Sequence, residues 1–156
     1  MKTWRIISIL VLWLCLSAQT SNYDYEDTVD EAFDKSILLI SANEHACYRF
    51  DVYLAVTSEQ RRRGLMFVQN LPKFTGMLFI YPTSRILSIW MKNTYIPLDI
   101  VFFDATGQIV NIHKNAEPHT LISRRSSAEV NYVLELNGGT AEELSIDTSS
   151  RVLLLD

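Results

Sequence analysis

Short runs of β-branched and aromatic residues, separated by turn-forming residues, recur from residue 36 to the end of the chain. Runs of this length with Pro, Gly or Asn between them are typical of antiparallel strands. A sheet of many strands must hide its edges. We therefore predict a mainly β (β-rich α+β) fold, a compact antiparallel sandwich or barrel-like sheet. The predicted strands are 36–41, 46–56, 76–82, 85–93, 98–104, 108–116, 131–137 and 151–155.

Two short helices are predicted between these strands by capping boxes. Thr57 precedes Gln60 by three residues, and Thr140 precedes Glu143 by three. In a capping box the first side chain accepts from a first-turn amide while the second reaches back to the cap. The first predicted helix begins near Ser58, and the second begins with the box at Thr140.

Residues 1–18 have the layout of a secretory signal peptide. Lys2 and Arg5 precede an apolar run, and small residues follow it, so we predict cleavage after Ala18. The apolar run is shorter than the roughly 20 residues that span a bilayer, so no permanent membrane anchor is predicted. The expected product is a secreted or periplasmic protein.

The segment that follows, 19–35, contains six acidic residues and no base before Lys35, which predicts an acidic disordered linker. From Lys35 onward the chain carries twelve basic and twelve acidic residues. A balanced charge disfavours nonspecific nucleic-acid binding, which needs a basic excess. We predict a single folded domain over 36–156.

The stretch "SIWMKNTYIPLDIVFFD" (88–104) places polar residues inside an otherwise apolar run. A buried carboxylate such as Asp99 is costly unless it is paired or hydrogen-bonded. Lys92 and Asn93 lie six or seven residues before it across a predicted turn. Two interpretations stay open: a polar corner in which the three side chains satisfy one another, or a pocket in which they bind a ligand beside Trp90.

The ligand interpretation predicts a small polar or anionic ligand and no catalysis. Trp90 would stack on the ligand, Lys92 would supply charge, and Asn93 and Asp99 would fix its orientation. Arg63 and Glu135 are added to this predicted ligand-binding set. The sequence contains no Gly-rich phosphate loop, no Ser-His-Asp ordering and no clustered His or Cys spacing for a metal, and no cofactor is predicted.

Three alternative functions are also considered. Asp99 and Glu135 could be the paired carboxylates of a glycosidase-like hydrolase. Met66, Met77 and Met91, with His113 or His119, could bind Cu(I), because soft ligands select that ion. An exposed apolar patch or an open strand edge would instead indicate a protein-interaction module.

Four motifs, in order, resemble one known family: "RRRGLMF", "GMLFIYP", "WMKNTYIPLDIVFFDATGQIV" and "YVLEL". They are similar to the DUF192 family, also called UPF0127, whose members are small and often exported domains. The resemblance runs from about Cys47 to Val152 and implies a compact β-rich fold. It implies no reaction, because the family's function is unassigned. The chain departs from the family pattern at "LISRRSS" (121–127), where Arg124 and Arg125 would bias a ligand contact toward anions.

Overall fold

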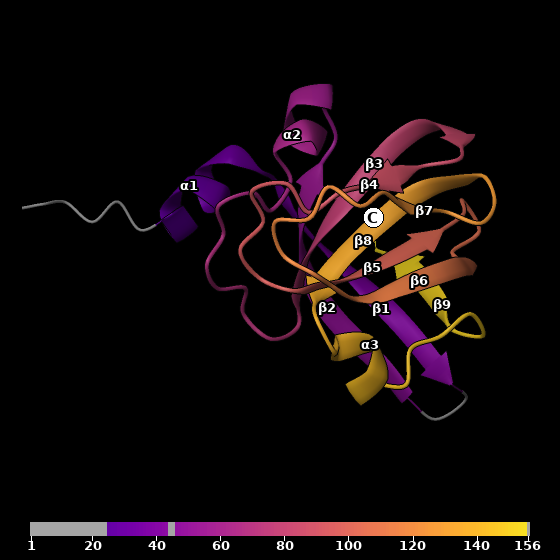
Figure 1. Ribbon diagram of the computed structural model, residues 1–156. Helices are drawn as coiled ribbons and strands as arrows, with labels where there is room; N and C mark the ends of the chain where they lie inside the picture. The colour runs from indigo at the N-terminus through magenta and orange to yellow at the C-terminus, as the bar shows by residue number, and fades with distance from the viewer. Residues whose placement is uncertain (1–24, 44–45, 156) are drawn as a thin grey trace, which may run out of the picture.

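The fold is a curled seven-stranded sheet with short helices around it, in a computed structural model that describes residues 25–43 and 46–155 (Figure 1). The strand order is β6-β5-β8-β3-β2-β1-β9, and β4 and β7 form a separate two-stranded sheet. The strands are β1 (Lys35–Asn43), β2 (Ala46–Ala55), β3 (Thr75–Arg85), β4 (Ser88–Ile89), β5 (Leu98–Phe103), β6 (Ile109–Ala116), β7 (Arg124–Arg125), β8 (Val130–Asn137) and β9 (Arg151–Leu154). The predicted mainly β, barrel-like class is confirmed.

The curl of the sheet brings its two ends together. Gln108, at the turn before β6, forms a bridge with Arg151 of β9. The amide of Val152 donates to the carbonyl of Gly107 at 2.8 Å. All strand pairs are antiparallel except β2 with β3, which run parallel because α2 (Ser58–Arg63) crosses between them. This parallel pair departs from the predicted antiparallel sheet.

Apolar side chains are buried on both faces of the sheet. One cluster contains Leu38, Val101 and Leu134 and is completed by Leu144 and Ile146 near α3 (Thr140–Glu143). The other contains Met77, Ile100 and Val133 and is covered by loop residues such as Leu65 and Val68. All six residues of β5 are buried because both faces of this strand are covered.

Helix α1 (Tyr25–Ala32) lies inside the segment that we predicted to be a disordered linker. Val29 and the following Phe33 are buried in the core, and the carbonyl of Ala32 accepts from Gln60 Nε2 at 3.2 Å. From residue 25 onward the segment forms α1 and leads into β1, because two apolar residues spaced by one helical turn give this acidic segment a face to bury. Residues 19–24 and the predicted signal peptide lie outside the described residues.

The predicted capping box of the first helix is confirmed. Thr57 Oγ1 accepts from the amide of Gln60 at 3.1 Å, and Gln60 Oε1 accepts from the amide of Thr57 at 3.0 Å. The predicted box at Thr140 is wrong: the cap of α3 is Gly139, which makes no side-chain cap bond because it has no side chain. No helix within the described part of the chain is long and apolar enough to cross a membrane.

Replacing Thr57 by alanine should lower the free energy of unfolding by about 1 kcal/mol, because one first-turn amide of α2 loses its acceptor. Urea unfolding of Thr57→Ala checks the value. Thr83→Ala is the matched control, since Thr83 is exposed in β3, and it should change the unfolding free energy little. Equal effects from both substitutions would contradict the capping role.

Candidate functional site

Glu135 is a buried acid in the middle of β8. It lies opposite Met77 of β3 and Ile100 of β5, and it is 5% exposed. Its carboxyl group makes no hydrogen bond or ion pair with the residues that the structure describes. Burial raises the pKa of Glu135 from 4.5 to about 8. The group is therefore protonated at neutral pH and can donate a hydrogen bond.

A cavity of about 100 Å³ opens beside Glu135. Four of the six predicted ligand-binding residues line it: Arg63 at the end of α2, Trp90 after β4, Lys92 in the next turn, and Glu135. The other lining residues are Arg61, Arg62, Gly64, Leu65, Met66, Phe79, Tyr81, Ser88, Ile89 and Thr94. The lining thus includes four basic residues and one acidic residue, and the guanidinium of one of them, Arg63, lies over the ring of Phe33, 5.4 Å from its centroid.

Trp90 and Lys92 stand at the mouth of this cavity. Trp90 is 54% exposed, and Lys92 Nζ lies 5.9 Å from the centroid of its indole. This separation is within the range of a cation–π contact. The two residues offer a flat apolar surface and a positive charge to whatever approaches the opening.

Arg61 fixes α2 against the sheet and forms one wall of the cavity. Its guanidinium donates to the carbonyl of Val56 and, at 2.9 Å, to the carbonyl of Ile80. It also lies over the ring of Tyr81, 4.8 Å from the centroid. Burial raises the pKa of the Tyr81 phenol, and the nearby charges of Arg61 and Arg85 partly oppose this effect. Sequence reasoning missed Arg61 and Tyr81 as site residues, although both lie inside the motifs that carry the family resemblance.

Asn93 does not line the cavity but shapes the turn that carries Lys92. Its φ is 55°, a left-handed conformation that asparagine adopts more readily than most residues. The amide of Thr94 donates to the carbonyl of Met91 at 3.2 Å, and the carbonyl of Asn93 accepts from the amide of Phe67 at 2.8 Å. Of the predicted strand 85–93, only Ser88–Ile89 (β4) forms a separate strand: Arg85 ends β3, and the chain turns after Ile89.

Asp99 is fully buried and lies away from the cavity. Oδ1 accepts from the amides of Asn115 at 2.8 Å and Gly139 at 3.1 Å, and Oδ2 accepts from the amide of Ala141 at 2.7 Å. The expectation that Lys92 and Asn93 pair with Asp99 is wrong, because these backbone donors satisfy the carboxylate. Asp99 joins β5, β6 and the start of α3, and it supplies the cap that α3 lacks locally.

Asp99 and Glu135 point to opposite faces of the sheet. In the β5–β8 register Asp99 is opposite Leu136, whereas Glu135 is opposite Ile100. Residues that face each other across antiparallel strands share a side, and successive residues alternate sides. The two carboxyl groups therefore cannot flank one cleft. This geometry rules out the alternative of a glycosidase-like hydrolase that uses Asp99 and Glu135 as its paired carboxylates.

The methionines proposed for Cu(I) lie in apolar or partly buried surroundings. Met77 and Met91 are fully buried in the apolar cluster that covers the Glu135 face. His113 Nε2 lies 2.9 Å from the carbonyl of Arg125, and His119 packs against Tyr95 with ring centroids 5.2 Å apart. No group of three His, Cys, Asp or Glu side chains placed for a metal is found over 25–43 and 46–155.

Fold and site together define a small mainly β domain with a cation-lined cavity over a buried carboxyl group. The model of the DUF192 family, described as "Uncharacterized ACR, COG1430", matches residues 39–154. The chain belongs to the DUF192 family. Among proteins with curated descriptions, none matches this sequence.

Two solved structures are similar to this chain over most of its length. One is a protein from Sinorhizobium meliloti 1021, described provisionally as a transcription regulator; it is 37% identical, with a TM-score of 0.76 over 78% of this chain and 95% of that one. The other is a protein of unknown function from Novosphingobium aromaticivorans DSM 12444; it is 32% identical, with a TM-score of 0.73 over 76% of this chain and 84% of that one.

Proposed function

We propose that this protein is an exported, non-catalytic domain that binds the anionic or polar group of a small ligand in the Glu135 cavity. The observation that carries the proposal is the convergence of Arg63, Trp90, Lys92 and Glu135 on one opening. A protonated acid in a cavity whose lining includes Lys92 and three arginines favours a ligand group that is negatively charged and accepts hydrogen bonds.

The size of the cavity narrows the ligand. A volume of about 100 Å³ corresponds to roughly three water molecules of liquid, well below the roughly 300 Å³ at which drug-sized sites begin. One carboxylate or phosphate group fits inside. The rest of the ligand would lie outside, over the exposed indole of Trp90, where an apolar or aromatic portion can stack.

We expect thermal-shift and calorimetric titrations with acetate, benzoate, citrate and inorganic phosphate at pH 7 to identify a binding anion. Lys92→Ala and Trp90→Ala should each weaken that binding about tenfold, since one charged or stacking contact is lost. Lys114→Ala is the matched control, because Lys114 is exposed on β6 outside the cavity. Binding of every anion with equal affinity by all three variants would remove the proposal.

The export part of the proposal rests on the sequence of residues 1–18. Intact-mass measurement of the protein recovered from a bacterial periplasm or medium should give a chain that starts at Gln19. Recovery of the full-length chain in the cytoplasm only would contradict it.

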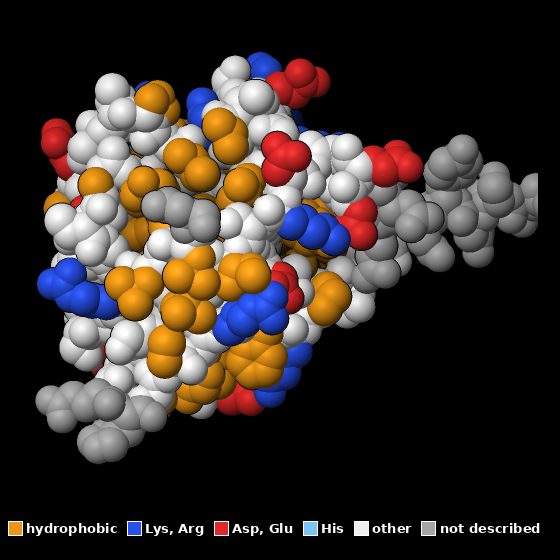
Figure 2. Space-filling view, turned by 180° about the vertical axis from the view of Figure 1, so that it is seen from behind, with side chains coloured by type: hydrophobic (Ala, Val, Ile, Leu, Met, Phe, Trp, Pro, Cys, Tyr) orange, Lys and Arg blue, Asp and Glu red, His pale blue; other side chains and the backbone are white. Residues whose placement is uncertain are grey.

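A second candidate function, self-association, is supported by β9. This strand ends the sheet order, and Leu153, Leu154 and Leu155 are 40–47% exposed. Figure 2 shows hydrophobic side chains gathered on the back face of the molecule, and the partly exposed Ile37 and Leu39 of β1 lie beside this strand. Beyond Val152, where the contacts with Gly107 and Gln108 end, an edge strand with apolar flanks can pair with the same strand of a second copy. Light scattering that shows only monomer at high concentration would reject this function.

A further inference from the structure

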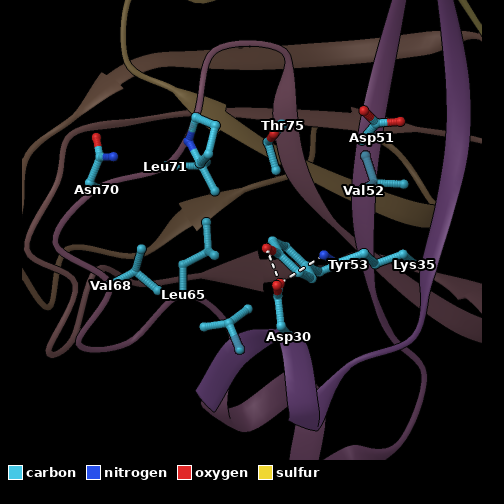
Figure 3. Close-up of a pocket in the computed structure, with 12 residues that line it drawn as sticks. Asp30, Lys35, Asp51, Val52, Tyr53, Leu65, Val68, Asn70, Leu71 and Thr75 are labelled. Carbon is cyan, nitrogen blue, oxygen red and sulfur yellow. Dashed lines mark hydrogen bonds and ion pairs between the residues drawn. The ribbon is translucent and has the colours of Figure 1, made fainter. Parts of the chain in front are cut away.

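A second and larger cavity lies on the other side of Leu65 from the Glu135 cavity. Its volume is about 360 Å³, and it is bounded by α1, by β1 and β2, and by the segment 65–75 (Figure 3). This volume falls in the range of roughly 300–1,000 Å³ that is usual for small-molecule sites. Five lining side chains are apolar and at most 5% exposed: Val29, Val52, Leu65, Val68 and Leu71.

The mouth of this cavity carries hydrogen-bond acceptors. Asp30 Oδ1 accepts from Lys35 Nζ at 2.8 Å and from the Tyr53 hydroxyl at 2.6 Å. Figure 3 shows the Asp30 carboxyl directed toward the space between Tyr53 and Leu65. The hydrogen bonds from Lys35 and then from Tyr53 lower the pKa of Asp30, so the group is ionised at neutral pH. Its Oδ2 makes no hydrogen bond with the part of the chain that is described.

The mouth of the cavity offers one carboxylate oxygen to a hydrogen-bond donor. Lys35 pairs with Asp30 Oδ1, and Arg49 outside the lining pairs with Asp51 Oδ1 at 2.7 Å, so Asp30 Oδ2 is the acceptor that a ligand in the cavity can use. Thr75 adds a hydroxyl group. We propose that this cavity binds a small organic cation, a primary ammonium with an aliphatic or aromatic body. The body lies among Val52, Leu65 and Val68, and the ammonium donates to Asp30 Oδ2.

This site is separate from the proposed anion site and opposite to it in charge. Leu65 is the one residue that lines both cavities. A ligand in one cavity therefore contacts a different set of polar groups from a ligand in the other. If no anion binds the Glu135 cavity, the cation proposal is unaffected. If no cation binds the larger cavity, the anion proposal is unaffected.

The test is a titration of the protein with benzylammonium chloride at pH 7, followed by amide chemical shifts. We expect the largest shifts at residues of the cavity lining. Benzyl alcohol, which has the same body without the charge, should bind at least about tenfold more weakly, and benzoate should not perturb the lining. Benzoate binding as tight as that of benzylammonium, or no shift at the lining residues, overturns the proposal.

Substitutions at two residues, Asp30 and Val68, locate the site. Asp30→Asn should weaken benzylammonium binding about tenfold, while the control Asp34→Asn, at an exposed carboxylate outside the cavity, should leave it unchanged. Val68→Phe fills the cavity and should abolish binding; Val68→Met is the milder substitution if the first does not fold. Unchanged affinity in folded Asp30→Asn and Val68→Met protein contradicts the assignment.

Discussion

Replacing Asp99 by alanine is expected to lower the free energy of unfolding by about 4 kcal/mol. The substitution leaves the buried amide of Ala141 and the partly buried amides of Asn115 and Gly139 without their acceptor. An unsatisfied buried donor costs about 1–3 kcal/mol, and here one buried donor and two partly buried donors lose their acceptor at once. Equilibrium urea unfolding followed by circular dichroism measures the loss.

The control for Asp99 separates its hydrogen bonds from charge alone. Asp34→Ala removes an exposed carboxylate and keeps the backbone carbonyl of residue 34, which accepts from the amide of Leu54 at 2.8 Å. It should change the unfolding free energy by less than about 0.5 kcal/mol. Asp99→Asn keeps one acceptor oxygen, so its loss of unfolding free energy should lie between the losses of Asp34→Ala and Asp99→Ala. A loss below about 1 kcal/mol for Asp99→Ala would contradict the structural role.

The second large effect concerns Glu135 and pH. Its pKa is about 8 when folded, whereas the ordinary value is 4.5. The folded protein therefore holds a proton that the unfolded chain has released between these two values. The contribution of protonated Glu135 to the free energy of unfolding is complete below pH 4.5. It is lost as pH rises to about 8, at up to about 1.4 kcal/mol per pH unit.

Glu135→Gln should remove this dependence, because glutamine does not ionise. The difference in unfolding free energy between the wild type and Glu135→Gln should change by about 4 kcal/mol in favour of the variant between pH 5 and pH 8.5. Groups common to both proteins cancel in that difference. Glu129→Gln, at an exposed position, is the control. A difference that stays flat with pH would show that Glu135 titrates at its ordinary pKa in the folded protein.

Local patterns in the sequence predicted most of the strands but not the partners of the polar residues. Alternation and turn residues located β5, β6 and β8 closely, and the box at Thr57 located α2. The strand 85–93 was overextended because apolar residues such as Met91 also fit a turn whose left-handed residue is Asn93. Disorder was predicted for α1 because its acidic composition outweighed two buried apolar residues, Val29 and Phe33.

The candidate site was predicted in residue type and only partly in geometry. Arg63, Trp90, Lys92 and Glu135 do line one cavity. The role of Asp99 could not be read from local sequence, because two of its donors, Gly139 and Ala141, lie about forty residues later. Asp99 and Glu135 point to opposite faces of the sheet because of the β5–β8 register, and no pattern within either strand specifies that register.

The pairing of β1 with β9 affects how the chain can fold during synthesis. Leu38, Leu39 and Ile40 of the first strand pair with Leu154, Leu153 and Val152 of the last. One edge of β1 therefore stays without its partner until β9 has been synthesised. Contacts of such long sequence separation form late and fold slowly. The curled sheet closes along this edge only after every other strand has been made.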